Sequence, residues 1–209
     1  EKLNIDANQG QVIAVLPGAR EVEVKNVLPT VLKALDQVLQ ASSDVTVIIS
    51  VAPTIRTSLV EDILKRSPNG RVRMERDDSC ALLAADLAIT SIGTGSLEAS
   101  LLGVPSLAVY RVPCTTYFAE KLLNRKPYMT ITNKILQKHV IPEFIQGDFN
   151  HGKIAATIGQ LLGDQGARQA MLTEFSQLEQ ELGELGSVER AAQVVLEMAG
   201  CVDDGTTSS

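Results

Sequence analysis

The chain has 209 residues, of which 44% are hydrophobic and 21% charged, with 15 glycines and 8 prolines. These proportions are typical of a globular protein and exclude a collagen-like, a disulfide-scaffold or a wholly disordered chain. The net charge of −6 and the small number of aromatic residues, four Phe and three Tyr without Trp, argue against a nucleic-acid-binding protein.

The numbers and spacing of cysteines and histidines indicate whether disulfides or a metal site are to be expected. The three cysteines are widely spaced without a CxxC pair, which is typical of reduced thiols in a cytoplasmic protein. Two histidines and no HExxH motif provide few ligands for zinc, so neither a metal nor another cofactor is expected. No apolar run approaches the roughly 20 residues of a membrane-spanning helix. Because the sequence begins at Glu1 without an initiator Met, we expect a fragment of a longer protein.

Short apolar runs alternate with longer amphipathic stretches along the first 124 residues. In chain order they predict strand 11–16, helix 21–40, strand 44–51, helix 54–66 opened by Pro53, strand 71–75, a short helix capped by 77–79, strand 86–90, helix 96–103, strand 106–110 and helix 114–124. This alternation predicts a doubly wound, Rossmann-like parallel sheet with helices on both faces.

The pattern changes after residue 150. Three helices are predicted over 151–163, 166–182 and 187–199, followed by a polar tail. We therefore expect a Rossmann-like domain over 1–165, helices over 166–200 that pack on it or extend from it, and a disordered tail over 201–209.

Charge is distributed unevenly along the chain. Residues 111–153 hold seven Lys or Arg against three acids, whereas residues 165–200 hold two against six. Bound anions are therefore expected near the middle of the chain.

The strongest local motif is Ser91-Ile-Gly-Thr-Gly-Ser96, where a predicted strand leads directly into a helix. Gly93 and Gly95 allow close approach of the backbone, and a helix N-terminus presents unpaired N–H groups to an anion. Thr94 and Ser96 add hydroxyl donors. Since ligands of doubly wound sheets bind at the carboxyl ends of the strands, this loop predicts a site for a phosphate-bearing ligand.

The identity of that ligand is narrowed by what the motif lacks. A GxGxxG fingerprint begins at Gly93 but has Glu98 in place of its third glycine, which argues against a dinucleotide-dependent dehydrogenase. The P-loop motif GxxxxGK[ST] is absent, which argues against a P-loop NTPase. Glu98 is suited to accept hydrogen bonds from ribose hydroxyls. The alternative is an acid favoured by the helix dipole alone.

A second motif, Leu16-Pro-Gly-Ala-Arg-Glu21, follows the first strand. Arg20 lies near a helix N-terminus, where a cation opposes the helix dipole. We interpret it as a guanidinium that grips phosphate oxygens at the same sheet edge as Gly93. The alternative is a solvated Arg20 paired with Glu23 three residues later.

A third motif comprises Ile131-Thr-Asn133 and Val140-Ile-Pro-Glu-Phe-Ile-Gln146. Pro142 suits a first helical position, which would place Glu143 and Gln146 on one helix face. Taken alone, this spacing also fits a capped surface helix.

In this order, the three motifs resemble those of lipid-A-disaccharide synthases over about residues 11–165. The matching residues are Leu16-Pro-Gly-Ala-Arg20, Thr90-Ser-Ile-Gly-Thr-Gly-Ser-Leu-Glu-Ala99, Leu102-Gly-Val-Pro105, Val109-Tyr-Arg111, Asn133 and Ile141-Pro-Glu-Phe-Ile-Gln146. The family usually has a small residue in place of Ile92 and a Pro in place of Thr132.

The resemblance implies a bacterial, metal-independent glycosyltransferase of the two-Rossmann GT-B architecture. Such an enzyme transfers a diacylated glucosamine from a UDP donor to a lipid-linked glucosamine phosphate, giving a β-1,6 disaccharide and UDP. By resemblance, Arg20 is the catalytic residue. The residues implied in UDP-sugar binding are Gly18, Ser91, Gly93, Thr94, Gly95, Glu98, Asn133, Glu143 and Gln146.

The resemblance also implies partners beyond the UDP-sugar donor. An acceptor-binding domain is expected before residue 1, and a homodimer is among the expected assemblies. A cytoplasmic location with peripheral contact at the inner membrane is expected, and the basic stretch 121–138 would either face anionic headgroups or form a solvated surface. The alternatives are another UDP-sugar enzyme, such as a UDP-N-acetylglucosamine 2-epimerase, and a non-catalytic nucleotide-binding module.

Overall fold

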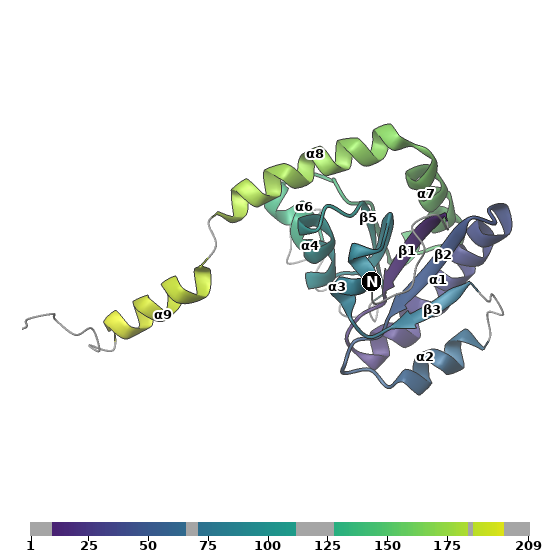
Figure 1. Ribbon diagram of the computed structural model, residues 1–209, viewed down its shortest axis with the longest axis horizontal. Coiled ribbons are helices and arrows are strands. Elements are labelled where there is room, and N and C mark those ends of the chain that lie inside the picture. Colours follow the sequence, from purple (N-terminus) through teal and green to yellow (C-terminus); the bar gives the residue numbers. More distant parts are fainter. Residues whose placement is uncertain (1–9, 66–70, 112–127, 184–185, 199–209) are drawn as a thin grey trace, which may run out of the picture.

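The computed structural model describes residues 10–65, 71–111, 128–183 and 186–198 and confirms the doubly wound α/β fold (Figure 1). One parallel sheet has the strand order β3-β2-β1-β4-β5-β6. Its strands are β1 (Gln11–Leu16), β2 (Val45–Ser50), β3 (Val72–Glu75), β4 (Leu87–Ser91), β5 (Ser106–Tyr110) and β6 (Glu143–Ile145). The chain runs outward from β1 to β3 and then returns to β4 on the other side of β1. This reversal is the topological switch point where such sheets bind ligands.

Helices connect the strands and continue beyond the sheet. They are α1 (Glu21–Ala41), α2 (Thr57–Leu64), α3 (Asp78–Leu83), α4 (Thr94–Leu101), α6 (Ile131–Leu136), the 3-10 turn η1 (Gln146–Asp148), α7 (His151–Gly163), α8 (Gln165–Leu182) and α9 (Ser187–Met198). The helix predicted over 114–124 and the tail predicted over 201–209 lie outside the described residues. No helix in the described ranges is long and apolar enough to span a membrane.

The alternating side chains of β1 show why both faces of the sheet are covered. Ile13 and Val15 belong to a large core with the buried residues of α1 and α7. Val12, Ala14 and Leu16 point to the opposite face and pack with α3 and α4. Because successive strand residues point to opposite faces, a fully apolar strand requires helices on both.

The helix that the sequence predicts over 54–66 begins later, at Thr57. Pro53 does not open it, because the backbone first makes a turn in which the Ile55 N–H donates to the Ala52 carbonyl at 2.9 Å.

The helix predicted to begin at Pro142 is wrong. Glu143–Ile145 instead forms the edge strand β6, parallel to β5, and Gln146 begins a 3-10 turn. The Ala108 N–H donates to the Pro142 carbonyl at 2.8 Å, so the proline takes part in the ladder as an acceptor. Proline lacks an N–H and is accommodated at a sheet edge, which a helix-start rule does not distinguish from a first helical position.

The last two helices, α8 and α9, differ in how they pack on the sheet domain. Helix α8 packs on the sheet domain through Met171, Phe175 and Leu178, which are all buried. Helix α9 projects away from the rest of the described chain (Figure 1), and Val194 and Val195 on it are exposed.

Candidate functional site

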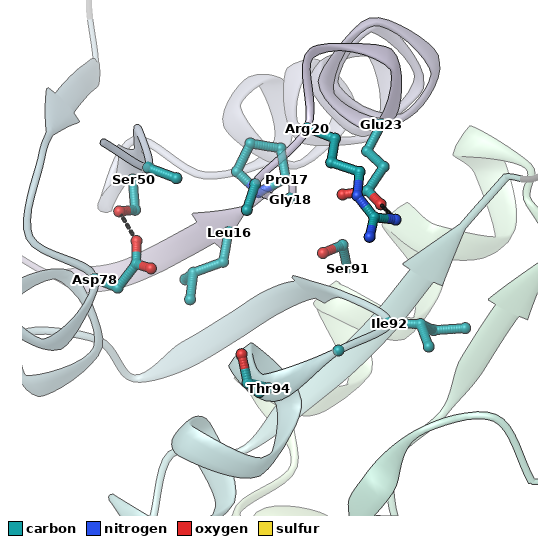
Figure 2. A pocket seen from close by; sticks show the side chains of 14 residues that line it. Leu16, Pro17, Gly18, Arg20, Glu23, Ser50, Asp78, Ser91, Ile92 and Thr94 are labelled. Atoms are coloured by element: carbon teal, nitrogen blue, oxygen red, sulfur yellow. Dashed lines mark hydrogen bonds and ion pairs between the residues drawn. The ribbon is translucent and has the colours of Figure 1, made fainter. Parts of the chain in front are cut away.

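A cavity of about 260 Å³ opens at the carboxyl ends of β1, β2 and β4. The residues that line it are Leu16, Pro17, Gly18, Ala19, Arg20, Glu23, Ser50, Ala52, Asp78, Ser91, Ile92, Gly93, Thr94 and Gly95. Figure 2 shows Arg20 and Glu23 on one side of it and Ser50 and Asp78 on the other, with Leu16 between them. The cavity thus lies at the switch point of the sheet.

Two of the sequence motifs meet here, as their positions after β1 and β4 predict. Gly18 and Arg20 from the Leu16–Glu21 motif line the cavity, as do four site residues predicted at the end of β4 and the start of α4. Those four are Ser91, Gly93, Thr94 and Gly95.

The N-terminus of α4 points its first turn at the cavity. Gly93 is the N-cap residue, and no side chain caps the helix, so its first N–H groups are available to an anion. A Cβ on Gly95 would lie 3.3 Å from Leu16 Cδ2, so this glycine allows α4 to approach β1 closely. A Cβ on Gly93 would meet nothing within 4 Å, because the space above this glycine is open.

Of the two hydroxyl residues of this loop expected to meet a ligand, Thr94 and Ser96, only Thr94 lines the cavity. Thr94 is exposed and lines the cavity. The Ser96 side chain is fully buried, and its hydroxyl donates to the Gly93 carbonyl at 2.9 Å. The expectation that Ser96 supplies a ligand donor is therefore wrong, because this hydroxyl holds the loop closed on itself.

Arg20 occupies the N-cap position of α1, with an extended backbone and a side chain that is 81% exposed. Its guanidinium Nη1 lies 3.3 Å from Glu23 Oε1. The pairing with Glu23 that the sequence leaves as an alternative is therefore present. It does not remove Arg20 from the cavity, which both side chains line.

Some lining residues do not follow from the sequence motifs. Ser50 is the last residue of β2 and Asp78 the first of α3, and the Ser50 hydroxyl donates to the Asp78 carboxylate. Ser50 thus ends its strand, whereas Asp78 follows the end of β3 by three residues, directly after Asp77, whose side chain caps α3 by accepting from Cys80 N. Since the carboxyl ends of parallel strands share one edge, the strand predictions contain the signal that would have found them.

Glu98, the predicted ribose ligand, lies further along α4 and does not line the cavity. Its carboxylate accepts a hydrogen bond from the Ser79 hydroxyl at 3.0 Å. Glu98 thus faces α3, on the Asp78 side of the cavity, and contact with a ribose stays a prediction.

Asn133, predicted to line the donor pocket, is fully buried and does not reach the cavity. Its amide nitrogen donates to the Ile141 carbonyl at 2.8 Å and to Glu143 Oε1 at 2.9 Å. Its oxygen accepts from the N–H groups of Val140 and Ile141, both at 2.9 Å. With every amide position engaged, this side chain holds β6 to α6.

Glu143 is also engaged in hydrogen bonds within the chain, in the same segment as Asn133. Its carboxylate accepts from the N–H groups of Met129 and Thr130 and from the Thr130 hydroxyl, at 2.8–3.1 Å. Gln146 has a φ of 50° and begins η1 after β6. Neither residue lines the cavity. The third motif therefore forms a hydrogen-bonded clasp at the β5–β6 side of the sheet.

Helix N-termini favour an anion at the cavity, whose described charged lining residues are one cation, Arg20, and two acids, Glu23 and Asp78. Helices α1, α3 and α4 all begin beside the cavity, and the N-terminal ends of helices carry partial positive charge. Next to it, Arg56 bonds Glu21 through two contacts of 2.6 and 3.1 Å. The hydrogen bond from Arg56 lowers the pKa of the Glu21 carboxyl, and the same bond raises the pKa of Arg56. In the described ranges, no group of three His, Cys, Asp or Glu side chains is placed to hold a metal.

Comparison with known proteins decides the family. The profile of the lipid-A-disaccharide synthetase family matches residues 1–198. This chain belongs to that family. Lipid-A-disaccharide synthases from Syntrophus aciditrophicus and Synechocystis are 37% and 36% identical to it, over 88% and 95% of the chain. These matches cover 48% and 51% of the relatives, so the chain spans about half the length of the curated relatives it matches.

Solved structures share the fold at low sequence identity. The S. aureus MnaA–UDP co-structure matches with a TM-score of 0.63 and 11% identity, over 95% of this chain and 50% of that one. CalG4, the calicheamicin glycosyltransferase, matches with a TM-score of 0.56 and 17% identity, over 94% of this chain and 44% of that one. These likenesses support the Rossmann-like half of a GT-B architecture predicted from the sequence.

Proposed function

We propose that this chain is the donor-nucleotide-binding half of a lipid-A-disaccharide synthase. We infer the class of reaction from the family to which the chain belongs, and we propose the cavity as the binding site of the nucleotide. The single observation that carries the proposal is the meeting of Arg20 and the uncapped N-terminus of α4 at one cavity. Together they present a guanidinium and a row of backbone N–H groups to a diphosphate.

The proposed reaction breaks the bond between the anomeric carbon of the acylated glucosamine and the β-phosphate oxygen of UDP. A hydroxyl of the lipid-linked glucosamine phosphate forms the new bond and loses its proton to a base outside this chain. Negative charge then gathers on the departing UDP. Arg20 and the first N–H groups of α4 stabilise that charge, which lowers the barrier because they are in place before the bond breaks.

The family membership favours this reaction over the epimerase alternative, since an epimerase uses no acceptor lipid. A non-catalytic nucleotide-binding module would keep the cavity but have no transfer activity. Product analysis separates the three: disaccharide and UDP for the synthase, an epimerised UDP-sugar for the epimerase, and no product for the module.

The acceptor half is proposed to be a separate domain, because the relatives are about twice as long as the match. Peripheral membrane contact and a homodimer belong to the same proposal. Among the basic residues proposed to face lipid, Lys138 is paired with Glu174 at 2.8 Å. Lys121, Arg125 and Lys126 lie outside the described residues.

The test is binding of UDP by the chain, followed by transfer in an enzyme that carries this chain as its donor half. We expect saturable binding of UDP and formation of disaccharide. An enzyme with both halves that is folded and binds UDP but forms no disaccharide would contradict the synthase assignment.

A further inference from the structure

Glu23 is an acid inside a cavity that we assign to a diphosphate, and the proposed function leaves it without a role. It lies in the first turn of α1, where the helix dipole favours a carboxylate. Its side chain is only 19% exposed and lines the cavity. A carboxylate in such a position calls for an explanation, because alone it would repel phosphate.

The loop before α1 is shaped around this side chain. Gly18 has a φ of 118°, a conformation that favours glycine. A Cβ at Gly18 would lie 2.6 Å from Glu23 Oε2 and 3.0 Å from Glu23 Cβ. The glycine of the Pro-Gly-Ala-Arg motif therefore makes room for the glutamate five residues later. Figure 2 shows the two residues next to one another, with Arg20 between Glu23 and Ser91.

The contact with Arg20 explains what the carboxylate does there. Glu23 Oε1 lies 3.3 Å from Arg20 Nη1, and this is the one hydrogen bond between the two side chains. A guanidinium has five N–H donors, so an ion pair through one nitrogen leaves the others for phosphate oxygens. The pairing also compensates the charge of the carboxylate.

Resting on the proposed function, we propose that Glu23 is a positioning residue that holds the Arg20 guanidinium at the cavity before the diphosphate binds. A long, 81% exposed side chain would otherwise lose rotamer freedom on binding. Glu23 acts through Arg20 and not by touching the ligand. Removing it should therefore weaken diphosphate binding only while Arg20 is present.

Calorimetric titration of the chain with UDP tests this. Glu23→Ala is expected to weaken binding by about three- to tenfold, as for one side chain that must be ordered on binding. Glu23→Gln keeps an oxygen acceptor and should restore most of the affinity. Added to Arg20→Ala, Glu23→Ala should cause no further loss. The matched control is Glu21→Ala, an acid of the same helical turn that is also ion-paired but does not line the cavity.

Tighter binding of UDP by Glu23→Ala would show that the carboxylate repels the ligand and would overturn the inference. Unchanged affinity, or a further loss in the Arg20→Ala background, would also overturn it. Absence of UDP binding by the unsubstituted chain would contradict the proposed function and the inference with it. Normal binding by the unsubstituted chain with no effect of Glu23→Ala would contradict the inference alone.

Discussion

At the residue scale, ligand binding at the cavity is expected to depend on a few residues, and the contacts of each residue determine its role. Arg20 is the exposed cation that lines it, and the charge of this guanidinium is the feature that a diphosphate would recognise. Gly18 contributes through its backbone and through the space it leaves. Substitutions at these two positions therefore test binding and folding separately.

Arg20→Ala is expected to weaken UDP binding by about ten- to hundredfold, the range for one or two hydrogen bonds to a charged group. It should also abolish transfer in the two-domain enzyme. The midpoint of thermal unfolding without ligand should stay almost the same, because this side chain is exposed and, within the described residues, bonds only Glu23. Titration calorimetry and a thermal scan check both expectations. Unreduced transfer would remove Arg20 from the mechanism.

Gly18→Ala is expected to destabilise the fold by about 1–3 kcal/mol, because an alanine is strained at positive φ. The added methyl group would also meet Glu23 at 2.6 Å. Urea unfolding measures the loss. The control is Gly93→Ala, where the added Cβ meets nothing within 4 Å and stability should change little. Equal stability of the two variants would show that the loop does not need this glycine.

At the scale of elements, the sheet and most helices could be predicted because their signals are local. Buried strands appear as apolar runs, and α1 shows its apolar face at helical spacing. The segment at Pro142 was mispredicted because its partner strand lies more than thirty residues away, at Ala108. Whether a proline opens a helix or joins a sheet edge depends on that distant neighbour.

The candidate site shows the same limit. The two loops after β1 and β4 could be predicted to meet, because parallel strands share a carboxyl edge. The hydrogen bond between Asn133 and Glu143 could not be predicted from the sequence, because both residues have the polar side chains that ligand-binding residues also have. Only the three-dimensional arrangement shows that their polar atoms are already occupied.

Glu143→Ala is expected to lower the free energy of unfolding by about 1–3 kcal/mol, because it leaves donors of Met129, Thr130 and Asn133 without their acceptor. Urea unfolding is the measurement. Glu174→Ala, which removes an acid from the partly exposed pair with Lys138, should cost only about 0–1 kcal/mol. If Glu143→Ala weakened UDP binding without affecting stability, the residue would be a ligand and not part of the clasp.

The ion pair between Glu21 and Arg56 joins the β1–α1 and β2–α2 connections and should depend on pH. Because Arg56 lowers the pKa of Glu21, the pair stabilises the fold above the ordinary carboxyl pKa and loses that effect as the pH falls through the lowered value. Arg56→Gln should therefore lower the unfolding midpoint slightly at neutral pH. The difference should shrink as the pH falls below the ordinary carboxyl pKa, vanish below the lowered pKa of Glu21, and shrink in high salt. A difference that persists in acid would show that the pair is not its cause.

At the scale of the whole molecule, the chain consists of a sheet domain with α8 packed on it and α9 extending from it (Figure 1). The domain boundary predicted at residue 165 stays a prediction; α8 lies in the segment predicted to pack on the sheet domain or extend from it. Ser106 N even donates to the sulfur of Met171 at 3.3 Å.

Two truncations test this organisation. Ending the chain at Gly183, which removes α9, should leave the unfolding midpoint almost unchanged. Ending it at Gly163 removes three buried side chains of α8, each of which contributes about 1.5–3 kcal/mol. Differential scanning calorimetry should show a large loss for the shorter chain alone. A similar loss on removal of α9 would contradict the packing described here.

We expect this chain to bind the diphosphate of a uridine nucleotide at the cavity between α1 and α4. Thermal unfolding with UDP, compared with ATP and NAD, tests it most directly. A ligand at a hundred times its dissociation constant adds about 2.7 kcal/mol to stability, which shifts the midpoint clearly. We predict a shift with UDP that exceeds those with ATP and NAD and that is lost in Arg20→Ala. No shift at millimolar UDP, or equal shifts with all three nucleotides, would contradict the claim.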